Sequence, residues 1–159
     1  MITIRKHSGI YTLELKQELP VSIEEAWEFF SNPANLAKIT PGHMGFRITS
    51  GDHVTMYPGQ IISYRVSPFP GFSTNWVTEI THVESMKYFV DEQRFGPYRM
   101  WHHEHRFEKS NGGIIMTDKV TYKLPFAVLG HLAYFLFVRK QLRRIFEYRY
   151  QMLSLFFNP

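Results

Sequence analysis

A long helical pattern follows Pro125 and continues through Phe157, and it limits the folds that the rest of the chain can adopt. Along one face, residues recur at spacings of three and four, and all but Arg149 are apolar: Phe135, Val138, Leu142, Ile145, Arg149 and Met152. A helix of about thirty residues is roughly 45 Å long, which exceeds the width of a small domain. Such a helix must run along the whole of the sheet that the preceding residues form.

Between about residue 44 and residue 123, the pattern is that of strands separated by turns. The candidate strands cover residues 44–49, 58–66, 72–83, 86–94, 98–109 and 113–123. Turn-forming pairs such as Gly96-Pro97 and Asn111-Gly112 divide them. Because no helical pattern intervenes between these strands, we expect antiparallel pairing.

One strand and two short helices precede this region. Residues 11–15 alternate between apolar and polar, as in a half-buried strand. Ser22 and Glu25 have the spacing of a capping box, which starts a short helix, and Pro33 suits the first turn of a second helix over residues 33–39. The order predicts an α+β fold, in which a curved antiparallel sheet of seven strands closes over one long helix.

The pair Asn111-Gly112 predicts how two strands meet. Asn-Gly favours a two-residue hairpin with a type I′ turn, in which both central residues have positive φ. Ser110 then faces Gly113, and the pairs on one face are Phe107 with Met116, His105 with Asp118, His103 with Val120, and Trp101 with Tyr122. This face is largely apolar, so we expect it to point inward, with His102, Glu104 and Arg106 pointing outward.

The two inward histidines admit three interpretations. His103 and His105 could bind zinc or non-haem iron with Asp118, although their spacing occurs in any strand. They could instead be core histidines hydrogen-bonded to Asp118. In the third interpretation, which we favour, the His–Asp pair is a polar anchor for a mostly apolar ligand. We therefore predict neither a metal nor a cofactor.

Aromatic residues make up 16% of the chain, which suggests a bulky core or a ring-lined cavity. Alternation places Tyr64, Phe72 and Trp76 on inward faces. The strand over residues 86–94 has two competing faces, so Asp91 either joins the polar anchor or lies in solvent. The predicted ligand-binding residues are Trp101, His103, His105, Phe107, Asp118, Tyr122, Tyr64, Trp76 and Asp91.

The formal net charge of +4 comes from one segment. Residues 139–149 hold five basic side chains against Glu147. We expect a solvated helix face that can make weak contact with an anionic surface through four of them, Arg139, Lys140, Arg143 and Arg144. Nucleic acid is not an expected partner.

The chain of 159 residues is long enough for one ordinary domain, which we expect to span residues 1–159. Its longest apolar run, residues 126–138, has about thirteen residues, short of the roughly twenty that span a bilayer. The absence of cysteine excludes disulfides and thiolate sites. The first residues lack the apolar core of a signal peptide, so we expect a cytoplasmic protein.

Two segments resemble a known superfamily. Residues 13–41, LELKQELPVSIEEAWEFFSNPANLAKITP, resemble the opening of START-like (SRPBCC) proteins, which include birch-pollen-allergen-like proteins and polyketide cyclases. The segments FVDEQRFGPYRMWHHEHRFE and MTDKVTYKLPF resemble a bacterial subgroup of ligand-binding SRPBCC domains. Its matching positions here are Asp91, Gly96, Pro97, Trp101, His103, His105, Phe107, Asp118, Val120 and Tyr122. The resemblance implies a helix-grip fold with a cavity between sheet and helix.

Two functions follow from the residues and the resemblance together. The first is binding or carriage of a hydrophobic molecule, such as a lipid, polyketide or aromatic compound, without catalysis. The alternative is a cyclase or dehydratase, in which His105, assisted by Asp118, moves a proton and His103 or Tyr64 polarises an oxygen. No nucleophile motif or phosphate-binding glycine loop accompanies these residues.

Overall fold

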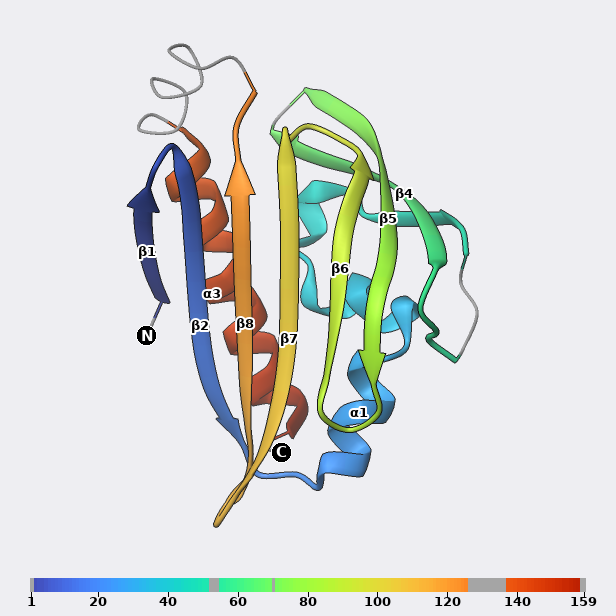
Figure 1. Ribbon diagram of the computed structural model, residues 1–159, viewed down its shortest axis with the longest axis vertical. Coiled ribbons are helices and arrows are strands. Elements are labelled where there is room, and N and C mark those ends of the chain that lie inside the picture. The colour runs from blue at the N-terminus through green and yellow to red at the C-terminus, as the bar shows by residue number, and fades with distance from the viewer. Residues whose placement is uncertain (1, 52–54, 70, 126–136, 158–159) are drawn as a thin grey trace.

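The computed structural model contains one antiparallel sheet of eight strands with helices on one of its faces (Figure 1). The structure describes residues 2–51, 55–69, 71–125 and 137–157. The sheet order is β1-β2-β8-β7-β6-β5-β4-β3. The strands are β1 (Ile2–His7), β2 (Ile10–Leu19), β3 (Arg47–Ser50), β4 (Gln60–Phe69), β5 (Phe72–Glu84), β6 (Tyr88–Phe95), β7 (Met100–Ser110) and β8 (Gly113–Lys123).

The α+β helix-grip prediction is confirmed, but the sheet has one strand more than expected. The additional strand, β1, pairs with β2 at the edge of the sheet, with Ile2 opposite Leu15 and His7 opposite Ile10. Ile2, at 9% exposed, is the one buried residue of this strand. An edge strand with one anchored end carries a weak alternation signal, which is why the sequence pattern did not reveal it.

The capping box is confirmed at the start of α1 (Ile23–Phe30). Glu25 N–H donates to Ser22 Oγ at 3.2 Å, and Ser22 N–H donates to Glu25 Oε2 at 3.0 Å. The second short helix, η1 (Pro33–Ile39), is a 3₁₀ helix capped by Asn32, and another 3₁₀ turn, η2 (Gly42–Met44), follows. These helices lie on the same face of the sheet as the C-terminal helix (Figure 1).

The C-terminal helix α3 (Arg139–Phe157) lies along the sheet behind β2 and β8 in Figure 1. Its buried residues are Leu142, Phe146, Arg149 and Leu153. Ile145 and Met152 of the predicted stripe are only half-buried, so at these two places the buried face lies one residue further along the helix. The first part of the expected helix, residues 126–136 with Phe135, lies outside the described residues. None of the helices in the described part of the chain combines the length and hydropathy that a membrane span requires.

The predicted register of β7 and β8 is confirmed, but the turn type is wrong. Ser110 faces Gly113, His105 faces Asp118 and Trp101 faces Tyr122. Neither Asn111 nor Gly112 has positive φ; Gly113 takes it instead, at +137°. A Cβ atom on Gly113 would lie 2.2 Å from the carbonyl oxygen of Leu19, so glycine permits the close approach of the hairpin to the end of β2.

Two of the apolar clusters in the core join the sheet to α3 through buried residues of both. One cluster contains Leu13 of β2, Val120 of β8 and Phe146 of α3. The other contains Leu19, Met116 and Leu153 of the same three elements. Between the two clusters, β2, β8, β7 and α3 each carry buried polar residues. These are Gln17 on β2, Asp118 on β8, His103 and His105 on β7, and Arg149 on α3. The fold therefore encloses a polar layer between two apolar regions.

Candidate functional site

Two histidines and two aspartates form a closed ring in this polar layer. His105 Nε2 lies 3.0 Å from Asp91 Oδ2, and its Nδ1 lies 2.8 Å from Asp118 Oδ1. His103 Nδ1 lies 3.3 Å from Asp91 Oδ2, and its Nε2 lies 3.2 Å from Asp118 Oδ1. The contacts of His105 with Asp91 and of His103 with Asp118 have hydrogen-bond geometry, whereas the other two are close approaches.

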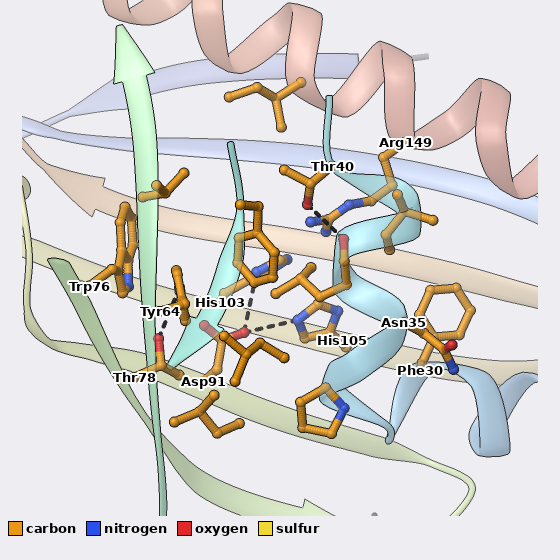
Figure 2. A pocket seen from close by; sticks show the side chains of 18 of the residues that line it. Phe30, Asn35, Thr40, Tyr64, Trp76, Thr78, Asp91, His103, His105 and Arg149 are labelled. Carbon is orange, nitrogen blue, oxygen red and sulfur yellow. Dashed lines mark hydrogen bonds and ion pairs between the residues drawn. The ribbon is translucent and has the colours of Figure 1, made fainter. Parts of the chain in front are cut away.

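Strand register brings these residues together. Asp91 on β6 faces His103 on β7, and His105 on β7 faces Asp118 on β8. Alternation directs all four side chains toward the helices. The sequence did not decide which face of the sheet carries Asp91. The structure places it on the inner face, between His103 and His105 (Figure 2).

Arg149 connects this ring to α3. Its Nη1 donates to Asp118 Oδ2 at 3.4 Å, and its guanidinium lies over the Phe146 ring, 4.9 Å from the centroid. The residue is 7% exposed. It therefore does not belong to the solvated basic face, where Arg139, Lys140 and Arg144 are exposed and Arg143 is half-buried. Contact of that face with an anionic surface stays a prediction.

Opposite charges keep the carboxylates ionised despite their burial. Burial alone would raise the pKa of Asp91. The charge of His103 and the contacts that Asp91 makes with both histidines outweigh burial and lower this pKa below its usual range. The pKa of Asp118 is also lowered, since Arg149 and the histidines outweigh burial there. For His103, burial lowers the pKa, but Asp91 and Asp118 outweigh it and the net change is upward.

A cavity of about 180 Å³ lies between the sheet, the short helices and α3. Its walls are mostly apolar and include Ile62, Val66, Trp76, Ile80, Leu142 and Phe146. Asp91, His103, His105 and Arg149 also line it, so the polar ring forms one part of the wall (Figure 2).

Six of the predicted ligand-binding residues line the cavity: Tyr64, Trp76, Asp91, Trp101, His103 and His105. The other three are buried elsewhere. Asp118 lies behind the histidines, Phe107 packs on Trp27, and Tyr122 stacks on Tyr11.

Phe72 differs from the prediction as well. It was expected to point inward, but it is 53% exposed at the hairpin end of β5. A register shift in the pairing of β4 with β5 lies beside it, between Val66 and Phe69. The alternation of apolar and polar residues does not reveal a register shift. It also does not reveal where along a strand the helices stop covering the inner face of the sheet.

The sequence pattern missed several polar or aromatic lining residues, among them Asn35, Thr40, Thr78, Tyr98 and Arg149. Asn35 and Thr40 donate to backbone carbonyls of Phe29 and Leu36. Arg149 had a signal, since a lone charge on an apolar helix stripe requires a buried partner.

A glutamine holds Tyr98 in the lining. Gln93 Nε2 donates to the Tyr98 carbonyl at 2.6 Å, and Tyr98 N–H donates to Gln93 Oε1 at 3.1 Å. A Cβ atom at Gly96 would lie 2.5 Å from the same Oε1. Glycine in the Gly96-Pro97 loop therefore leaves room for this pair of hydrogen bonds.

Tyr64 is a protonated group in the lining. Its hydroxyl lies 3.2 Å from Thr78 Oγ1. Burial and then the charge of Asp91 raise the pKa of Tyr64 above its usual range. Tyr64 can thus donate a hydrogen bond but does not ionise near neutral pH.

Among the described residues, one set of three side chains has the spacing of a metal site: Asp91, His103 and His105. One ligand atom from each lies within 4.8 Å of the other two. The ring can therefore act as a hydrogen-bonding anchor, as an acid–base pair or as a ligand set.

Comparisons with known proteins identify the fold. The structure is similar to protein Ms6760 from Mycobacterium smegmatis, with 15% identity, a TM-score of 0.67 and coverage of 98% of this chain and 99% of that chain. It is similar to CV1439 from Chromobacterium violaceum, with 15% identity, a TM-score of 0.69 and coverage of 93% and 98%. It is also similar to major latex-like protein 151 from Panax ginseng, with 11% identity, a TM-score of 0.69 and coverage of 96% of this chain and 100% of that chain.

No curated protein matches the chain significantly in sequence. Residues 19–149, however, match the family described as polyketide cyclase / dehydrase and lipid transport. That span includes every residue of the ring. The chain therefore belongs to the polyketide cyclase / dehydrase and lipid transport family, within the START-like (SRPBCC) superfamily.

Proposed function

We propose that the protein binds a hydrophobic small molecule that carries a hydroxyl or another hydrogen-bond donor. The observation that carries this proposal is one oxygen of Asp91. Both contacts of Asp91 with the histidines use Oδ2, which leaves Oδ1 without a partner among the described residues. A carboxylate oxygen that faces an apolar cavity gains by accepting a hydrogen bond.

The size of the cavity limits the ligand. A dry cavity of about 150 Å³ accommodates benzene. The space here, about 180 Å³, suits an aromatic ring system or a short chain in the structure as it stands. The family description, which includes lipid transport, supports the same class of ligand.

Calorimetry with 2-naphthol and naphthalene tests the proposal, because the two probes differ by one hydroxyl. A hydrogen bond to a charged group contributes about 1.5–3 kcal/mol, so we expect 2-naphthol to bind at least about tenfold more tightly. In Asp91→Asn, the histidines retain the amide oxygen and the NH₂ group faces the cavity. The NH₂ group can only donate a neutral hydrogen bond to the naphthol oxygen, so the preference for 2-naphthol should become several-fold smaller.

A pair of adjacent residues on β4 provides the control for location. Ile62 is 6% exposed and lines the cavity, whereas Ile61 is 46% exposed on the other face. Ile62→Trp should abolish binding of both probes, and Ile61→Trp should leave it unchanged. Binding that survives in a folded Ile62→Trp protein would place the probe outside this cavity.

A second candidate function, acid–base catalysis, is favoured by the position of His105. Its Nε2 contacts Asp91 at the cavity wall, so a bound molecule would lie beside a proton donor and an acceptor. Dehydration of a β-hydroxy aryl ketone is a suitable assay, because the enone product absorbs in the ultraviolet. Turnover that survives joint His103→Gln and His105→Gln replacement would exclude this mechanism.

A further inference from the structure

The distances around Asp91 match those between ligands of one metal ion. Asp91 Oδ2 lies 3.3 Å from His103 Nδ1 and 3.0 Å from His105 Nε2. Bonds of about 2.1 Å, at angles between octahedral and tetrahedral, place two ligand atoms about 3.0–3.4 Å apart. Both distances lie in this range.

A second carboxylate lies where metal-binding histidines require one. Histidine ligands usually donate their other ring N–H to a carboxylate or carbonyl, which fixes the orientation of the ring. Asp118 Oδ1 lies 3.2 Å from His103 Nε2 and 2.8 Å from His105 Nδ1, the nitrogens that face away from Asp91. Asp118 is 1% exposed and is held in turn by Arg149.

The charge of the ring also suits a cation. Histidine ligands are neutral. With neutral imidazoles, Asp91 and Asp118 together with Arg149 carry one net negative charge. A divalent ion would leave a net charge of +1 and would replace protonated His103 as the cation beside Asp91.

We propose that Asp91, His103 and His105 bind a divalent first-row transition-metal ion, such as zinc or iron(II), with Asp118 as a positioning residue. Two imidazoles and one carboxylate leave coordination positions open. These positions face the cavity, because the three ligands line it and Asp118 does not. Water or an oxygen atom of a small molecule would complete the coordination. The inference does not depend on the function proposed above.

Titration of the full, metal-stripped chain with cobalt(II) tests this site, because the ion gives a visible absorption band that reports on its ligands. We expect one equivalent to bind, with displacement by zinc. Asp91→Asn and His105→Gln should each weaken binding by more than about 100-fold. Asp118→Asn should weaken it about 10–100-fold and shift the visible band, since it leaves the ligands in place but frees their orientation.

His102 provides a matched control on the same strand. It lies on the outer face of β7, with Nδ1 2.7 Å from Glu92 Oε1, so it is also a histidine beside a carboxylate. His102→Gln should bind cobalt as the wild type does. Loss of binding in this variant, with retention in Asp91→Asn, would assign the metal to the surface and overturn the proposal.

The wild type supplies a test that does not depend on variants. A metal that binds the folded state raises the thermal unfolding temperature. Wild-type protein that gains no thermal stability from zinc and no visible band from cobalt refutes the site, even if a variant fails to fold. Calorimetry with naphthalene and 2-naphthol remains a separate readout, so failure of the metal site and failure of ligand binding are distinguishable.

Discussion

Arg149 is the buried cation on which the polar layer depends, and its replacement by methionine tests the electrostatic account. The guanidinium lies 3.4 Å from Asp118 Oδ2, and the residue is 7% exposed. Methionine keeps an unbranched apolar side chain that packs against Phe146 but removes the charge. Asp118 would then remain in the interior without its one arginine partner.

The structure sets the expected magnitude. Removing one partner of a buried ion pair costs about 3–5 kcal/mol. Asp118 retains His103 at 3.2 Å and His105 at 2.8 Å, so we expect the low end, about 3 kcal/mol. This is at least a fifth of the total stability of a typical domain, which is about 5–15 kcal/mol.

Equilibrium unfolding in urea measures this loss, with an unchanged slope because the surface exposed on unfolding is the same. Arg144→Met is the control: it removes an exposed charge from the same helix and should change the free energy of unfolding by less than about 0.5 kcal/mol. Equal values for Arg149→Met and Arg144→Met would refute the reasoning, since they would mean that Asp118 needs no cation from α3.

Three further predictions concern local structure and pH. Ser22→Ala should lower the free energy of unfolding by about 1 kcal/mol in urea denaturation, because it removes the cap of α1. Gly113→Ala should lower the melting temperature strongly, since its Cβ would lie 2.2 Å from the Leu19 carbonyl oxygen at a φ of +137°; Gly112→Ala, which meets only a flexible glutamate tip at 3.3 Å, should not. The pKa of His103 is raised on folding, because its carboxylate partners outweigh burial. In the metal-stripped protein, its contribution to stability is therefore complete below about pH 6.5 and is lost as the pH rises through the folded-state pKa. His103→Gln should flatten this alkaline limb of urea-measured stability.

Much of the fold could be predicted from local patterns. Alternation and the Asn111-Gly112 turn gave the correct register of β7 and β8, because a one-residue slip would turn every side chain to the other face. Ser22 and Glu25 marked the start of α1, because a capping box needs only residues three apart. The type of the turn was not predictable, since it depends on how closely Gly113 approaches Leu19.

The candidate site was predictable only in part. The inward direction of His103, His105 and Asp118 followed from one hairpin. The side of Asp91 did not, because pairing of β5 with β6 contains register shifts, one of them between Ile80 and His82, that no turn signal reports.

The sequence by itself determined seven of the eight strands, the capped first helix and an inward pair of histidines, because propensity, alternation and turn chemistry act over a few residues. The tertiary structure alone decided that Asp91 completes the ring and that Arg149 belongs to it. Asp118 and Arg149 are 31 residues apart, and no local rule relates a strand to the helix that packs over it. The packing of α3 on the sheet brings them together and turns two histidines on a strand into an enclosed site.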